Sequence, residues 1–155
     1  MHFLLGLGFS SRRDFLAGAA ASTIVSPMKE DAPLRQNAIN PTGSSYSQAM
    51  EVRNASRWAF VSGQVPADEN GAVPEAFHDQ ARLVWRNIDK QLRDAEMTLA
   101  NIVKITTFLS DRQYRQANYE VRHAVLGDHS PAMTIIIADI YDLAWLLEIE
   151  VVAAA

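Results

Sequence analysis

The sequence predicts an α+β domain in which two helices cover one face of a single mixed β-sheet. Two segments, residues 75–96 and 113–127, repeat apolar residues at helical spacing. Five short segments are rich in branched or aromatic residues, as strands are: residues 46–52, 57–63, 101–110, 133–140 and 146–153. Their order, β-β-α-β-α-β-β, packs into two layers around one core.

The N-terminal residues 1–27 differ from the rest of the chain. They contain the pair Arg12-Arg13, then Phe15-Leu16 and a stretch rich in Ala and Gly that ends before Pro27. This pattern resembles a twin-arginine export signal and predicts a periplasmic or otherwise exported protein, with no membrane association after the signal is removed. The alternatives are an amphipathic arm or a misassigned start codon, and either would leave the protein in the cytoplasm.

The segment from residue 28 to 45 has two prolines, a glycine and no apolar period, so we expect an extended arm before a domain spanning 46–155. Residues 46–52 and 57–63 then alternate as two short strands. The polar residues 53–56 lie between them, which is typical of a hairpin. Gly71 lies in a polar loop and can adopt a left-handed conformation there.

The helix at 75–96 has the clearest pattern. A single apolar stripe runs along it, formed by Phe77, Ala81, Val84, Ile88, Leu92 and Ala95. In the second helix, residues 113–127, the apolar face comprises Tyr114, Ala117, Val121, Ala124 and Val125, and Gly127 suits its C-terminal cap.

The strand segments carry large apolar residues on both sides, whereas two helices can cover only one face of the sheet. The other face would be an exposed apolar patch unless subunits meet there, so we expect an oligomer. The net charge of −4, with no cluster of Lys or Arg, argues against nucleic acid as a partner. The chain has no cysteine, which excludes disulfides and thiolate chemistry.

The ordered set "YSQA", "FVSGQVP", "RNIDKQLRDA", "VKITTFL", "NYEV", "PAMT" and "LEIEV" resembles the Rid (RidA, YjgF) family over residues 46–153. The resemblance implies a chorismate mutase-like fold assembled as a homotrimer, with a cleft between neighbouring subunits. It also implies cofactor-free hydrolysis of 2-imino acids, the tautomers of enamines, to 2-oxo acids and ammonia.

Six residues match positions that line the cleft in the family. Glu148 would be the catalytic group that orients the attacking water. The substrate-binding set would comprise Tyr46, Ser62, Gly63, Asn118 and Met133. At the position of Met133 the deaminating members have an arginine, which grips the substrate carboxylate. Methionine has neither charge nor donor. The resemblance therefore implies a pocket that persists with an altered substrate range.

Each of these residues also has a plainer interpretation. Glu148 and Glu150 lie two apart in a strand, so both point away from the core, and Glu150 is interpreted as structural. Ser62 lacks the Gly-x-Ser-x-Gly motif that surrounds a nucleophilic serine, so it is interpreted as a residue that offers hydrogen bonds. Tyr46 suits a packing role equally well, and Asn118 suits an exposed surface amide. Lys104, Arg57 and Arg35 are candidate substitute cations. The histidines show no metal-binding spacing, so no metal or cofactor is expected.

Two functions of different classes follow from this pattern. The first is an imine or enamine hydrolase acting on a C–N bond, and the second is a non-catalytic protein that binds a small metabolite in the same cleft. A ribonuclease activity is also associated with the family, but the net negative charge of the chain argues against it.

Overall fold

The computed structural model describes residues 32–155, and the predicted export segment lies outside this range. The described chain forms six strands, two helices and two short 3₁₀ turns. In order they are β1 (Arg35–Pro41), β2 (Ser47–Arg53), β3 (Trp58–Gln64), α1 (Phe77–Asp94), η1 (Leu99–Asn101), β4 (Ile102–Leu109), η2 (Arg112–Tyr114), α2 (Arg115–Leu126), β5 (Ala132–Ile137) and β6 (Leu147–Ala154). The α+β class predicted from the sequence is confirmed.

All six strands join one mixed sheet in the order β1-β2-β5-β4-β6-β3. β4 and β5 run parallel and are connected through α2, whereas β6 pairs antiparallel with both β4 and β3. β2 joins β5 through one aligned pair, Ser47 and Ala132. The ribbon of β1 and β2 therefore has only a narrow connection to the rest of the sheet.

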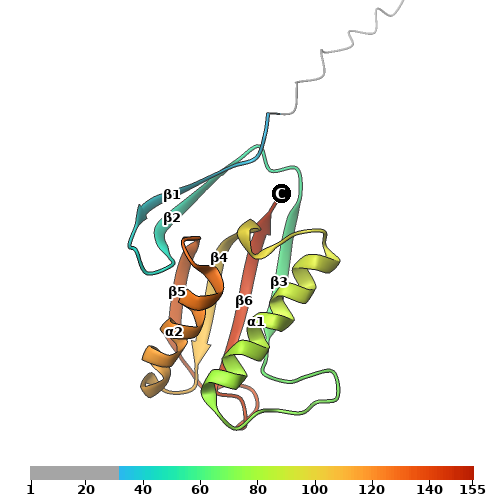
Figure 1. The fold of residues 1–155 in the computed structure, drawn as a ribbon, viewed down its shortest axis with the longest axis vertical. Helices are drawn as coiled ribbons and strands as arrows, with labels where there is room; N and C mark the ends of the chain where they lie inside the picture. The colour runs from blue at the N-terminus through green and yellow to red at the C-terminus, as the bar shows by residue number, and fades with distance from the viewer. Residues whose placement is uncertain (1–31) are drawn as a thin grey trace, which may run out of the picture. The chain divides into compact units, whose positions relative to one another are not determined.

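Both helices lie on the same face of the sheet (Figure 1). The stripe predicted for α1 is buried there, including Phe77, Ala81, Val84, Ile88 and Leu92. It packs on alternate residues of the central strands, such as Ile105 and Leu109 of β4 and Ile149 of β6. The period-two burial of β4 and β6 gives the sheet one core face and one face without helices, which we call the open face.

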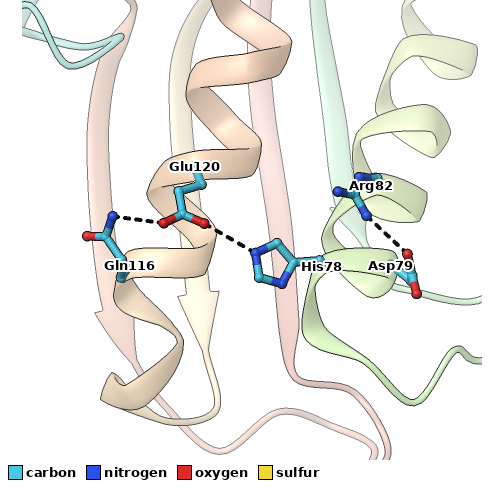
Figure 2. A network of polar contacts seen from close by, with 5 residues as sticks. All are labelled: His78, Asp79, Arg82, Gln116 and Glu120. Atoms are coloured by element: carbon cyan, nitrogen blue, oxygen red, sulfur yellow. Dashed lines mark hydrogen bonds and ion pairs between the residues drawn. The ribbon is translucent and has the colours of Figure 1, made fainter.

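Two contacts join the start of α1 to η2 and α2. The Phe77 ring stacks on Tyr114, with ring centroids 4.7 Å apart and planes 7° apart. Next to it, His78 contacts the exposed Glu120 of α2 at 3.3 Å, and Glu120 also accepts a hydrogen bond from Gln116 (Figure 2). The Gln116 amide, and then His78, lower the pKa of Glu120.

The hairpin expected between residues 46–52 and 57–63 is wrong. β2 pairs with β1 and β5, whereas β3 pairs with β6 at the opposite edge of the sheet. Residues 53–56 therefore connect β2, the second strand of the sheet, to β3 at its far edge. The partner of β2 comes from the segment expected to be an extended arm, of which Arg35–Pro41 forms β1.

The buried face of α2 is rotated from the predicted one. Val121 is buried as expected, but Ala124 is exposed, and the polar residues Asn118 and Arg122 are buried instead. Gly127 caps the helix with a φ of 54°, a left-handed conformation that glycine adopts without strain. The rotation brings an arginine into the interior, which no apolar periodicity would predict.

The open face carries large apolar side chains. Phe60 is 78% exposed and Trp58 is 49% exposed, both on β3, and Ile136 of β5 is also exposed. Lys104 lies on the same face and donates to Thr134 at 2.6 Å. None of the helices within residues 32–155 is both long enough and apolar enough to cross a membrane.

Candidate functional site

A cavity of about 490 Å³ lies between α2, β5 and the loop that precedes β2, and we call it the α2 cavity. It contains two of the predicted site residues, Tyr46 and Met133. Its lining consists of Ser44, Tyr46, Arg115, Gln116, Tyr119, Arg122, Met133 and Ile135. Met133 aligns with the buried Ile105 of β4, so its side chain points to the helix-covered face of the sheet.

The loop that precedes β2 forms one wall of the α2 cavity. Three hydrogen bonds fix this loop to α2 and to the C-terminal cap of α2. Arg122 Nη2 donates to the Ser44 carbonyl at 3.0 Å. The Ser45 hydroxyl lies 2.6 Å from His123 Nδ1 and donates to the Gly127 carbonyl at 2.7 Å. Because that hydroxyl has a single proton, His123 Nδ1 must be the donor to Ser45. Tyr46, the next residue, is thereby held beside the cavity.

Arg122 is the most unusual residue of the α2 cavity. Its side chain is 3% exposed, and its Nε has no hydrogen-bond partner among the described residues. The guanidinium carbon lies 5.5 Å from the centre of the Tyr119 ring, a cation–π arrangement. Burial lowers the pKa of Arg122, although a guanidinium remains protonated in proteins. Within residues 32–155 no carboxylate forms an ion pair with it.

A second group of predicted residues, Ser62, Gly63 and Glu148, lies on β3 and β6, and we call it the β3–β6 set. A Cβ on Gly63 would lie 1.6 Å from Glu148 Oε1, so the carboxylate occupies the space that the absent side chain leaves. Glu148 is half-buried and makes no hydrogen bond or ion pair with the described residues. Its oxygens are therefore available to a water or a ligand.

The α2 cavity and the β3–β6 set lie on opposite faces of the sheet. Glu148 aligns with Phe108 of β4, whereas the buried neighbours of Glu148, Leu147 and Ile149, point to the helices. Met133 points to the helices as well, and β4 separates its strand from β6. One copy of the chain therefore cannot bring Glu148 and Met133 to a single small ligand.

Asn118 is not the exposed surface amide that one interpretation of the sequence predicted. It is 2% exposed, does not line the α2 cavity, and its Nδ2 has no partner among the described residues. Gln116, two residues earlier, lines the cavity instead, together with Tyr119. The sequence analysis missed Gln116, Tyr119, Arg115 and Arg122. No apolar periodicity in the sequence marked Arg122 as buried.

The three candidate substitute cations lie elsewhere. Arg57 forms an ion pair with Glu96 at 3.2 Å, and Arg35 begins β1. Lys104 lines a shallower hollow of about 320 Å³ on the open face, which Ser62 and Glu150 also line. Among residues 32–155 there is no group of three His, Asp or Glu side chains placed to hold a metal ion.

Comparison with known proteins identifies the family. A family model described as Endoribonuclease L-PSP matches residues 35–155. The mitochondrial protein MMF1 of Saccharomyces cerevisiae is 31% identical over 122 residues, covering 78% of this chain and 82% of the yeast protein. A RutC family protein of Aquifex aeolicus is 33% identical over 70% of this chain and 86% of its own. The chain belongs to the Rid family.

Solved Rid structures share the fold. The crystal structure of yeast Mmf1 has a TM-score of 0.61 and 29% identity, covering 79% of this chain and 97% of that protein. Rid protein YyfB from Yersinia pestis has a TM-score of 0.68 at 23% identity, over 77% of this chain and 98% of its own, which is a likeness of fold alone. TdcF from E. coli, solved with bound serine, has a TM-score of 0.61 and 26% identity over 76% of this chain and 93% of its own.

Proposed function

We propose that this Rid-family chain forms a homotrimer that hydrolyses the C–N bond of a small imine or enamine without a cofactor. The observation that carries the proposal is the Glu148 carboxylate, held against Gly63 with no polar partner in the described part of the chain. A free, half-buried carboxylate is the group needed to orient and deprotonate water.

In the proposed reaction, Glu148 accepts a hydrogen bond from a water molecule whose oxygen attacks the imine carbon. The C–O bond forms as the C=N π pair moves to nitrogen, and the proton from water passes through Glu148 to that nitrogen. The tetrahedral intermediate then collapses to a carbonyl and releases ammonia. Ser62 and the backbone at Gly63 hold the substrate during these steps, and the balance is one imine and one water to one oxo compound and one ammonia.

Assembly with other copies would complete the site. Because the α2 cavity and the β3–β6 set face opposite sides of one sheet, a substrate touching both must lie between subunits. The exposed Phe60 and Trp58 give the open face the apolar surface that such contacts bury. The serine bound to the E. coli relative supports a small, amino acid-like ligand for this cleft.

The test is ammonia release from an imine generated in place by an amino-acid oxidase, compared with the uncatalysed rate. We expect Glu148→Gln to reduce the rate by about a hundredfold or more, in the range of general acid–base catalysis. Glu150→Gln, two residues away on the same face, is the matched control and should retain the wild-type rate. Equal rates for Glu148→Gln and wild type would contradict the proposed role.

The alternative is a non-catalytic protein that binds a metabolite in the same cleft. The observation that favours it is Met133, which lacks the donor that grips the substrate carboxylate in deaminating relatives. If this alternative holds, the purified protein should bind a small molecule with no ammonia release above background. Cleavage of RNA at moderate salt would instead point to the function in the family model's description.

A further inference from the structure

We propose that Arg122 is the carboxylate-binding residue of this chain, placed on α2 rather than on β5. The inference rests on the proposed function for its substrate class, a small 2-oxo or 2-imino acid. The anion would enter the α2 cavity beside Arg122 and Tyr46, with Met133 forming the apolar wall.

The first support is the unmet hydrogen-bonding capacity of the guanidinium. Nη2 donates to the Ser44 carbonyl, but Nε is buried without a partner among residues 32–155. A buried donor left unsatisfied is unfavourable and is rare in folded proteins. The guanidinium therefore has donor capacity that the described residues leave unused.

The second support is the charge. Nearly all of the Arg122 side chain is removed from solvent, and its only charged or π-electron contact in the described chain is the face of Tyr119. The described part of the chain contains no acidic side chain paired with it. A buried, unpaired positive charge is costly unless a counter-ion compensates it, and a site that binds anions supplies one.

The third support is the chemistry of the remaining lining. Tyr46 and Tyr119 offer hydroxyl donors, and Gln116 offers an amide, so a carboxylate could meet several donors at once. Met133 and Ile135 are apolar and suit the short aliphatic chain of the same ligand. The cation and the methionine share one cavity, so a charge absent at residue 133 is present at residue 122.

Arg115 is the natural matched control. It lines the same cavity but is exposed, so water screens its charge and its contribution to anion binding should be small. Two ligands separate charge recognition from shape. 2-Oxobutanoate carries the carboxylate, and 2-oxobutanamide has nearly the same size without the charge.

The experiment is titration calorimetry of the full chain with each ligand at fixed ionic strength. We expect the wild type to bind 2-oxobutanoate at least about tenfold more tightly than the amide, the gain typical of a charge-assisted hydrogen bond. Arg122→Gln should lose this preference and bind the acid and the amide about equally. Arg115→Gln should change the acid affinity by less than about threefold.

Three outcomes would overturn the inference: no acid preference in the wild type, an acid preference retained in folded Arg122→Gln, or its loss in Arg115→Gln. If Arg122→Gln does not fold, Arg115→Gln still decides, because a preference that persists there assigns the charge to Arg122. Ammonia release from the same preparations separates the two proposals. If acid binding depends on Arg122 but no ammonia is released, this inference holds and the hydrolase proposal is rejected. If ammonia is released at the same rate by wild type and Arg122→Gln, the hydrolase proposal holds and this inference is rejected.

Discussion

Gly63 determines where the Glu148 carboxylate lies. Its missing Cβ leaves the space that Glu148 Oε1 occupies, at 1.6 Å from where that atom would be. Gly63→Ala should therefore displace the end of a flexible side chain, with little effect on melting temperature. The rate of imine hydrolysis should fall by about a hundredfold, as for Glu148→Gln.

The control for this prediction is the double variant. If Gly63 acts only through Glu148, adding Gly63→Ala to Glu148→Gln should lower the rate no further. A further loss in the double variant would mean that the alanine obstructs the substrate directly.

Met133→Arg tests whether residues 122 and 133 share one space, as the lining of the α2 cavity indicates. Two guanidiniums would then face one cavity without a counter-ion. We expect the free energy of unfolding of the free protein to fall by roughly 1–3 kcal/mol, from crowding and charge repulsion. Arg122→Met with Met133→Arg should recover most of this loss, as measured by chemical denaturation.

Added 2-oxobutanoate should stabilise Met133→Arg more than it stabilises the wild type, because one carboxylate can neutralise part of both charges. If 2-imino acids are the substrates, Met133→Arg should also raise their hydrolysis, by roughly tenfold for one added charge-assisted contact. If Met133→Arg alone is as stable as the wild type in the absence of ligand, the side chains at positions 122 and 133 do not meet.

At the scale of the elements, the start of α1 has two contacts of very different strength with the segment around α2. Phe77 is buried and stacked on Tyr114, whereas its neighbour His78 meets an exposed glutamate. Phe77→Ala should lower the free energy of unfolding by about 3–5 kcal/mol, the usual cost of deleting a buried ring. His78→Ala, the adjacent control, should lower the melting temperature far less.

The small effect of His78→Ala should depend on pH in a defined direction. The pKa of Glu120 in the folded protein lies below its ordinary value, so its contribution is present at neutral pH. That contribution is lost as the pH falls through the folded pKa. The melting temperatures of wild type and His78→Ala should therefore differ slightly while Glu120 is ionised, and converge once the pH lies below the folded pKa of Glu120. A difference that persists after Glu120 is protonated would contradict this assignment.

Local patterns predicted the elements well but not all of their partners. The stripe of α1 and the alternation of β4 and β6 are period signals that follow from burial on one side. Residues 53–56 resemble a hairpin turn locally. β3 instead pairs with β6, which comes from far along the sequence, so β2 and β3 are not neighbours in the sheet. β1 was missed because its residues are mostly polar or exposed at a sheet edge.

The candidate site was also predictable only in part, because its contacts depend on how the elements pair and pack. Gly63 and Glu148 were named from the family resemblance, and their contact depends on the β3–β6 pairing that no local pattern shows. Arg122 was missed because an arginine in a helix is normally solvated. Only the rotation of α2, with Asn118 and Arg122 turned inward, reveals it.

At the scale of the whole molecule, the open face of the sheet is the surface through which we propose that copies assemble. We propose that Phe60 and Trp58 pack between copies in the homotrimer. Phe60→Glu should therefore give monomers in sedimentation equilibrium at micromolar concentration, because each contact would bury a charge. Leu143→Glu, fully exposed between β5 and β6, is the control and should remain assembled. A monomeric wild type would contradict the trimer.

Export of the protein is also a proposal at this scale. If the paired arginines Arg12 and Arg13 belong to a working signal, protein recovered from a bacterial periplasm should begin after about residue 21. Replacing both with lysine should keep the chain in the cytoplasm, as judged by fractionation and N-terminal sequencing. Full-length protein in the cytoplasm regardless of the arginines would remove the export proposal.

The pairing of β3 with β6 has a consequence for how the chain acquires its fold. Val61 meets Val151 only after nearly the whole domain has been synthesised, and closing so long a loop delays the contact. Until then β3 presents unpaired backbone groups beside Trp58 and Phe60, a combination that favours association of incomplete chains. Refolding yield should therefore fall steeply as protein concentration rises, and dilute conditions should favour the native sheet.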